Sequence, residues 1–235
     1  PEQRAHSILE GLDGEQREVA LAVGGPVRVL AGAGTGKTRA ITHRIAYSVV
    51  IGASEAERTL ALTFTNRAAG EMRHRLLGLG VRGAQVRTFH AAALRQLRFF
   101  WPQLSRTAFP ELMSSKASIV ARSLAHCKVD SDKALLRDVS GDIEWCKSNM
   151  MDSALIHKAK RDFAIDVATL AKVMDSYETL KKDRNLLDFD DILMLMSAAI
   201  RTRPDIQSAV HSAYRWFTVD EFQDVNPLQK SVLDL

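Results

Sequence analysis

The sequence has few of the residues that define several special classes of protein. Its 235 residues include two cysteines, 13 glycines and 6 prolines. Cys127 and Cys146 lie 19 positions apart without a CxxC pair, which gives no support to a disulfide framework or a zinc site. We expect ordinary, partly buried thiols. With 46% hydrophobic and 26% charged residues, the composition indicates a folded globular chain and excludes disorder as the main state.

Long apolar segments are missing as well. No apolar run reaches the about eighteen residues that a membrane span requires. The first 25 residues lack the apolar core of a signal peptide and carry instead the charged residues Glu2, Arg4, Glu10, Asp13 and Glu15. We therefore expect a cytoplasmic protein without membrane contact. The length allows one large domain, or one domain with a sizeable insertion.

Charge is distributed unevenly, although the net charge is only +4. Residues 37–106 contain twelve Lys and Arg against three Glu, whereas residues 186–235 contain eight acids against four bases. A phosphate-binding half and a metal-binding half would have this pattern. Solvated helix faces with a chance imbalance of sign explain it equally well, so charge alone does not identify a partner.

Short β-branched runs alternate with helical patterns in the first hundred residues. The runs are residues 27–31, 59–63 and 86–88, and we expect each to be a strand. The helical patterns that follow them cover residues 38–51, a segment that Asn66 can cap, and about 91–100. Repeated strand and helix units predict a parallel sheet covered by helices on both faces.

After Trp101-Pro102 the alternation stops, and residues up to about 184 have helical patterns only. One example is the apolar stripe of Leu170, Val173, Met174, Tyr177 and Leu180. A helix over 186–201, a buried strand over 215–220 and a last helix starting near Asn226-Pro227 follow. The fold class is therefore predicted to be α/β: a P-loop sheet domain, residues 1–100 and 185–235, interrupted by an all-α subdomain, residues 101–184.

The strongest single motif is the segment Ala31-Gly32-Ala33-Gly34-Thr35-Gly36-Lys37-Thr38. It matches the phosphate-binding P-loop in the relaxed form that permits Ala at the first position. Its glycines let consecutive N–H groups turn inward around phosphate oxygens, and the following helix adds its positive dipole end. Lys37 would hold the β and γ phosphates and Thr38 a Mg²⁺ ion. The alternative, a plain Gly-rich turn, is less favoured between a predicted strand and a predicted helix.

A second motif, Val219-Asp220-Glu221, ends an apolar strand. Open α/β sheets collect their ligands at the carboxyl ends of their strands. Asp220 could bind Mg²⁺ through water, opposite Thr38, and Glu221 is placed to orient and deprotonate the water that attacks the γ-phosphate. Alone, an acidic pair after a strand is often a helix N-cap. Together with the phosphate loop, it favours catalysis.

The order of six segments resembles the UvrD/PcrA/Rep family of superfamily 1A DNA helicases, most closely actinobacterial UvrD-like helicases. In chain order the segments are Leu12-Asp13-Gly14-Glu15-Gln16, the phosphate loop, Thr63-Phe64-Thr65-Asn66-Arg67-Ala68-Ala69-Gly70-Glu71-Met72, Thr88-Phe89-His90, Leu187-Asp188-Phe189-Asp190-Asp191 and Asp220-Glu221-Phe222-Gln223-Asp224. The resemblance spans nearly the whole chain, although residues 102–184 match in length and helicity more than in motif.

The resemblance implies a RecA-like fold for the sheet domain and a MgATP site within it. Gln16 would hydrogen-bond the adenine edge, and Arg39 would flank the base. The phosphate loop, Asp220 and Glu221 would keep the roles given above. Gln223 would couple the state of the nucleotide to the grip on DNA.

The resemblance also implies contacts with single-stranded DNA. Phe64 would stack on a base, while Thr65, Asn66 and Arg67 would hold the backbone, a sequence-tolerant way to bind one strand. Thr88 and His90 belong to the next DNA-contacting segment. For Phe64 the alternative is a core aromatic at a strand end, and for His90 a satisfied histidine with no phosphate contact.

By the same resemblance, the chain is expected to be the N-terminal ATP-binding half of a longer bacterial, nucleoid-associated 3′–5′ helicase that works on single strands and on junctions with duplex during repair or replication. A second, C-terminal RecA-like domain would supply arginine fingers, each worth about a thousandfold or more in rate. The isolated chain should thus hydrolyse ATP poorly. Two alternatives stay open, a stand-alone nucleotide-gated DNA-binding module and a superfamily 1 motor on RNA.

Overall fold

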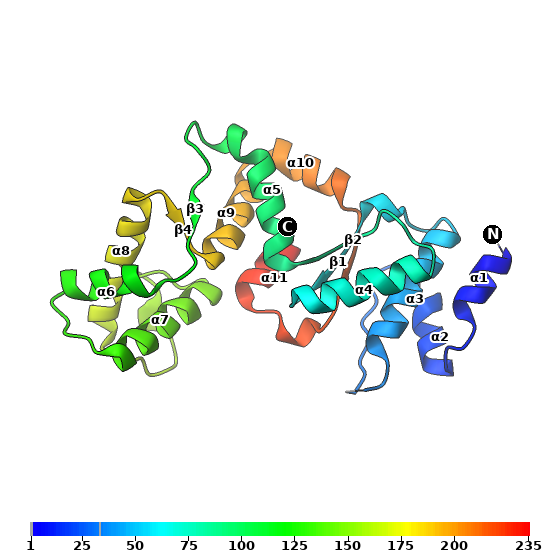
Figure 1. Cartoon of the computed structure of the whole chain (residues 1–235), viewed down its shortest axis with the longest axis horizontal. Helices are drawn as coiled ribbons and strands as arrows, with labels where there is room; N and C mark the ends of the chain where they lie inside the picture. The colour runs from blue at the N-terminus through cyan, green and yellow to red at the C-terminus, as the bar shows by residue number, and fades with distance from the viewer. Residues whose placement is uncertain (1, 33) are drawn as a thin grey trace. The chain divides into compact units, whose positions relative to one another are not determined.

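The computed structural model describes residues 2–32 and 34–235 and forms two compact units (Figure 1). The first unit comprises the residues up to Ala92 together with Asp205–Asp224. The second comprises Ala93–Pro204 and Val225–Leu235. Ala33 of the predicted phosphate loop lies outside the described residues.

A three-stranded parallel sheet organises the first unit. The central strand β1 (Thr59–Thr63) lies between β2 (Gln85–Thr88) and β5 (Trp216–Val219) (Figure 1). All five residues of β1 are buried, as expected for a continuous apolar strand inside a parallel sheet. Thr63 pairs with Thr88, and Leu62 with Val219. The carboxyl ends of all three strands therefore meet at one edge, and the predicted α/β class is confirmed.

The first unit has several helices, and those nearest the sheet share one apolar cluster with it. The helices of the unit are α1 (Glu2–Leu9), α2 (Gly14–Leu21), α3 (Lys37–Val50), α4 (Asn66–Gly78) and most of α10 (Pro204–Ala213), with the 3-10 helices η1 (Ala56–Arg58) and η3 (Phe222–Asp224). α3 packs against α1, α2 and α4. Ile41 and Ile45 of α3 meet Met72 and Leu76 of α4 in the core, which confirms the helical spacing seen in the sequence.

The strand predicted over residues 27–31 is wrong in this structure. None of the strand pairings among the described residues involves this segment, and Val27 and Leu30 are 40% and 79% exposed. A strand needs a ladder of backbone hydrogen bonds and covered faces. Residues 27–31 have the β-branched composition of a strand but neither a neighbouring strand to bond with nor a covered face. The segment that leads into the phosphate loop is therefore irregular.

The second unit is mainly helical. α5 (Phe89–Leu104) enters it from the first unit, and α6 (Ala117–His126), α7 (Lys133–Ser148), η2 (Ile156–Lys158), α8 (Val167–Asp183), α9 (Phe189–Thr202) and α11 (Pro227–Leu233) complete it. The predicted stripe on α8 is confirmed, because Leu170, Val173, Met174 and Tyr177 are buried in its core. A short parallel ladder of β3 (Glu111–Leu112) and β4 (Leu186–Leu187) is an addition to the all-helical pattern expected there.

The boundaries of the units differ from the predicted domain boundaries at residues 100 and 185. α9, α11 and the greater part of α5 group with the second unit, and α9 and α11 pack against α7 and against each other. The division into a RecA-like ATP-binding domain and an inserted helical subdomain stays a prediction.

Two further expectations concern cysteines and membranes. Cys127 and Cys146 are both free, the first partly buried and the second buried, as expected. Burial raises the pKa of the Cys146 thiol to about 11. Over the residues that the structure covers, no helix is long and apolar enough to cross a membrane.

Candidate nucleotide and DNA site

The phosphate-loop motif leads directly into α3. Gly36, the residue before the helix, has φ +80, and Gly34 has φ +78, both in the left-handed region that glycine adopts without steric cost. No side chain caps the N-terminus of α3. Its first N–H groups and the positive end of its dipole are therefore available to an anion.

The residues predicted to contact adenine lie beside this loop. The Gln16 side-chain amide donates to the Thr35 carbonyl at 3.2 Å, and the Thr35 hydroxyl donates to the Gly32 carbonyl at 2.8 Å. Arg39, in the first turn of α3, donates to the Gly11 carbonyl at 2.9 Å. The N-terminal segment is thus tied to the loop from two sides. Ala31 and Gly34 are exposed next to these residues.

The acidic pair after β5 is brought to the same place. The Asp220 N–H donates to the Leu62 carbonyl of β1 at 3.0 Å, which extends the sheet by one residue. Glu221 then turns out of the strand with φ +51. Its carboxylate pairs with the Lys37 ammonium at 3.0 Å and accepts a hydrogen bond from the Gln223 side-chain amide. Residues 184 positions apart therefore form one ion pair at the edge of the sheet.

The two carboxyl groups have opposite electrostatic environments. Hydrogen bonds from Gln223 and Lys37 lower the pKa of Glu221 below its usual range. Burial raises the pKa of Asp220, and the charge of Glu221 adds to this effect. The Thr38 hydroxyl, hydrogen-bonded to Asp220, acts in the opposite direction on that pKa. Thr38 and Asp220, the two predicted Mg²⁺ residues, are thus neighbours.

The residues expected to contact DNA follow β1 and β2. Because Thr63 and Thr88 pair at the ends of these strands, the segments after them start side by side. The rings of Phe64 and Phe89 lie 5.5 Å apart between centroids. Phe64 is half-buried and Phe89 is buried. The Phe64 ring therefore packs against an aromatic ring of the core and remains partly exposed. His90 lies in the first turn of α5.

Two of these residues have structural partners as well. The Thr65 hydroxyl accepts from the Ala68 N–H at 3.1 Å and caps α4. The expected cap, Asn66, is instead the first residue of the helix, because the extended backbone that an N-cap needs occurs one residue earlier. Arg67 pairs with Glu71 one turn later at 3.0 Å. The Arg67 side chain is 89% exposed, so this pair is weak.

Sequence reasoning missed a buried charged cluster in the second unit. Lys147 of α7 and Lys181 of α8 each contact both Asp188 and Asp191, over 2.5 to 2.9 Å. The two carboxylates also form the capping box of α9. The Tyr177 hydroxyl donates to Asp188 at 2.9 Å. We refer to these five residues as the buried network.

The two lysines and the two aspartates of the buried network balance in charge, and the half-exposed Glu178 carboxylate also pairs with both lysines, at 3.1 and 2.9 Å. Burial opposes ionisation of Asp188, but the charges of Lys147 and Lys181 hold the pKa of Asp188 well below its usual range. Burial likewise opposes the charge on Lys147, and the two aspartates hold the pKa of Lys147 above its usual range. Asp188, Asp191 and Glu178 are close enough to ligate a metal, but ammonium groups already occupy their oxygens. The network is therefore a structural device and not a cation site.

One signal in the sequence points to this network. The buried positions of α8 recur at helical spacing through Met174 and Tyr177, and the next position of that stripe is Lys181. A lysine at a core position needs a buried acid as partner.

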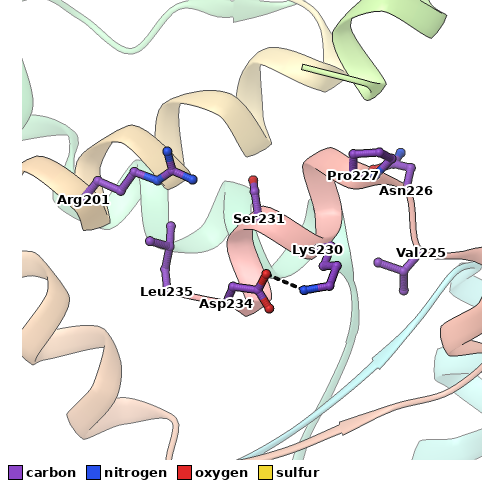
Figure 2. Close-up of a pocket in the computed structure, with 8 residues that line it drawn as sticks. All are labelled: Arg201, Val225, Asn226, Pro227, Lys230, Ser231, Asp234 and Leu235. Carbon is purple, nitrogen blue, oxygen red and sulfur yellow. Dashed lines mark hydrogen bonds and ion pairs between the residues drawn. The ribbon is translucent and has the colours of Figure 1, made fainter. Parts of the chain in front are cut away.

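A hollow of about 530 Å³ lies elsewhere in the second unit (Figure 2). Arg201 of α9 and residues of the 225–235 segment line it. Two of its charged residues, Lys230 of α11 and Asp234 at the C-cap of that helix, are one turn apart and pair with each other at 2.5 Å. None of the residues predicted for nucleotide or DNA lines this hollow, so it is not the candidate site.

Comparison with known proteins agrees with the order of the motifs. Residues 12–235 match the family model described as the UvrD/REP helicase N-terminal domain. The chain is 45% identical to the ATP-dependent DNA helicase UvrD2 of Mycobacterium tuberculosis, over 96% of this chain and 34% of the relative. It is 33% identical to UvrD1 of Mycobacterium bovis and 32% identical to PcrA of Leuconostoc citreum, over 96% and 97% of this chain and 30% and 31% of those relatives.

The chain therefore spans about a third of the length of the curated relatives that it matches. The family model covers all but the first 11 residues. The chain belongs to the UvrD/REP helicase family, and it corresponds to the N-terminal domain of that family.

Proposed function

We propose that this chain is the ATP-binding part of an ATP-dependent DNA helicase that moves along single-stranded DNA and unwinds duplex at a junction. The observation that carries the proposal is the ion pair between Lys37 and Glu221, because it joins the start of α3 to the end of β5. The relatives named as ATP-dependent DNA helicases support the substrate and the reaction. A fluorescent fusion of such a protein should lie at the bacterial nucleoid, in the cytoplasm.

The residues present fit a nucleotide with its magnesium ion. The uncapped N-terminus of α3 and the Lys37 ammonium suit phosphate oxygens. The Thr38 hydroxyl and the Asp220 carboxyl are hard oxygen donors of the kind that Mg²⁺ prefers, and Asp220 is 6% exposed. Such an ion, when bound, neutralises charge on the phosphates. Gln16 and Arg39 would contact the base from the N-terminal side.

Glu221 is the proposed general base. Its low pKa keeps the carboxylate ionised at neutral pH, so it can accept the proton of an attacking water. Lys37 neutralises this carboxylate while the two are paired. The Gln223 side-chain amide donates to the same oxygen of Glu221 as Lys37 does. Its hydrogen bond would therefore change when the Lys37–Glu221 ion pair breaks. The proposed DNA residues at the ends of β1 and β2 share an edge of the sheet with Glu221.

The deciding experiment is DNA-stimulated ATP hydrolysis by the 235-residue chain and by its full-length parent. We expect turnover only in the parent, because an arginine finger from another domain is worth about a thousandfold or more. Glu221→Gln should abolish parental turnover but retain nucleotide binding, whereas Lys37→Ala should lose binding. Glu18→Gln, the same change at an exposed position of α2, is the matched control.

Unchanged turnover in Glu221→Gln would refute the role of Glu221. Turnover by the isolated chain as fast as that of the parent would refute the need for a second domain. Partial duplexes with a 3′ or a 5′ single-stranded tail test the 3′–5′ direction in the parent. Unwinding of the 5′-tailed substrate alone would contradict it.

A further inference from the structure

A long part of the sequence contains arginine but no acid. Residues 72–110 include seven arginines and no Asp, Glu or Lys. α5 (Phe89–Leu104) lies in this part of the chain. The motif Thr88-Phe89-His90 ends in the first turn of α5, and the next motif begins at Leu187, so most of α5 belongs to none of them.

The part of α5 in the second unit has two different faces. Ala93, Leu97 and Phe100 are buried, and their spacing of four and three residues makes them the inner side of the helix. Arg95, Arg98 and Phe99 are exposed, and their spacing of three and four residues places them on one side of the helix. Phe99 is 70% exposed, which is unusual for so large an apolar side chain. We call these three residues the α5 face.

Neighbouring rings hold parts of the α5 face in place. The ring of Phe99 meets that of Phe100 edge to face, with centroids 5.0 Å apart. The guanidinium of Arg98 lies 5.4 Å from the centroid of the Phe109 ring, which itself packs on Trp101 at 5.1 Å. Because these groups are already restrained, less conformational entropy is lost when they bind a ligand.

The arginines of the α5 face are not neutralised. In the part of the chain that the structure covers, neither Arg95 nor Arg98 makes an ion pair, whereas the exposed Arg137 pairs with Asp138 and Arg67 with Glu71. An aromatic ring flanked by two unneutralised arginines suits a ligand with both negative charge and flat apolar surfaces. Single-stranded nucleic acid offers both phosphates and base faces. A protein partner would have to supply a series of acids instead.

We propose that the α5 face binds single-stranded DNA, with Phe99 stacking on a base and with Arg95 and Arg98 contacting phosphates. This inference rests on the proposed function, and it adds a contact surface in the second unit to the segments after β1 and β2 in the first.

The test is a fluorescence-anisotropy titration of the 235-residue chain with labelled oligothymidylate at several salt concentrations. Phe99→Ala and Phe99→Leu should each weaken binding about fivefold or more without changing the salt dependence, because base stacking is lost. Phe99→Trp should bind as wild type does. Arg95→Gln and Arg98→Gln should each reduce the slope of log affinity against log salt by about 0.7. Arg137→Gln, an exposed arginine on α7, should change neither quantity.

Several outcomes separate this inference from the proposed function. Wild-type binding by Phe99→Leu would overturn the stacking contact, since leucine keeps the apolar bulk but has no ring. If Phe64→Ala weakens binding and Phe99→Ala, Arg95→Gln and Arg98→Gln do not, the α5 face is wrong while the helicase assignment stands. Tighter binding of oligouridylate than of oligothymidylate would overturn the assignment to DNA.

Discussion

Replacing Lys181 by methionine tests the buried network most directly. The Lys181 side chain is 2% exposed and pairs with Asp188 and Asp191 at 2.9 and 2.6 Å. Methionine fills a similar volume but removes one of the two ammonium groups that neutralise these carboxylates. Lys147 is then the one ammonium of the network left for the two aspartates, and it also pairs with the half-exposed Glu178 at 3.1 Å, so one buried negative charge is left uncompensated. Removing one partner of a buried ion pair costs about 3–5 kcal/mol.

The free energy of unfolding, measured with urea, gives this cost. In a Trp216→Phe background the two remaining tryptophans, Trp101 and Trp145, both lie in the second unit, so fluorescence follows that unit. Lys182→Met is the matched control, since the neighbouring lysine is exposed on the same helix. We expect a change within about 0.5 kcal/mol for the control.

A double variant separates charge from packing. Lys181→Met with Asp188→Asn restores neutrality, because Lys147 then balances Asp191. Asparagine also remains a good N-cap for α9. The double variant should therefore recover at least about 2 kcal/mol of the loss, as coupling between contacting charges. A loss below about 1 kcal/mol in Lys181→Met, or no recovery in the double variant, would refute the network as a charge-balanced unit.

The contribution of Asp188 to the free energy of unfolding should fall as the pH is lowered. The pKa of Asp188 lies below its usual value of about 3.9. Its ionised form therefore stabilises the fold above about pH 4, and this contribution is lost as the pH falls toward the lower folded-state pKa. In Lys181→Met one compensating charge is gone, and burial then raises the pKa of Asp188 relative to the wild type. The variant should unfold at a higher pH on acidification.

Two smaller predictions concern the proposed nucleotide site and α4. Gly36→Ala places a Cβ 2.6 Å from the Gln16 amide nitrogen at a residue with φ +80. In an equilibrium dialysis assay, nucleotide binding by this variant should weaken at least about tenfold. Gly14→Ala, where a Cβ meets nothing within 4 Å, should leave nucleotide binding unchanged in the same assay. Thr65→Ala should lower the free energy of unfolding by about 1 kcal/mol, and Asn66→Ala by clearly less. Equal losses in a urea titration would contradict the capping role of Thr65.

Local patterns predicted much of the first unit. β1 and β5 are short apolar runs between helical segments, although β5 is not the buried strand that was expected, because Phe217 is 48% exposed. The rule that ligands gather at the carboxyl ends of parallel strands predicted Asp220 and Glu221 beside the phosphate loop. The structure pairs Glu221 with Lys37 at 3.0 Å. The motif order predicted the family, and the family model covers residues 12–235.

The features that the sequence did not predict depend on contacts with residues far apart in the chain. Residues 27–31 have the composition of a strand, but a strand requires a neighbouring strand, which no local pattern guarantees. The buried lysines show the same limit. Lys181 and Lys182 both occupy the last turn of α8 and look like ordinary residues that complement the helix dipole. Two features distinguish the buried Lys181 from the exposed Lys182. Lys181 falls at the next position of the apolar stripe of α8, and the aspartates of α9 lie beside it.

The Lys37–Glu221 pair also links binding to catalysis within the proposed function. The Lys37 ammonium donates to Glu221, and a phosphate oxygen that binds the same ammonium would compete for its three N–H donors. When Lys37 turns to a phosphate, Glu221 loses one of the two hydrogen bonds that lower its pKa. Its basicity then rises toward that of an ordinary glutamate, which makes it a better proton acceptor. Phosphate binding and activation of the base would thus be one event, since the same ammonium serves both groups.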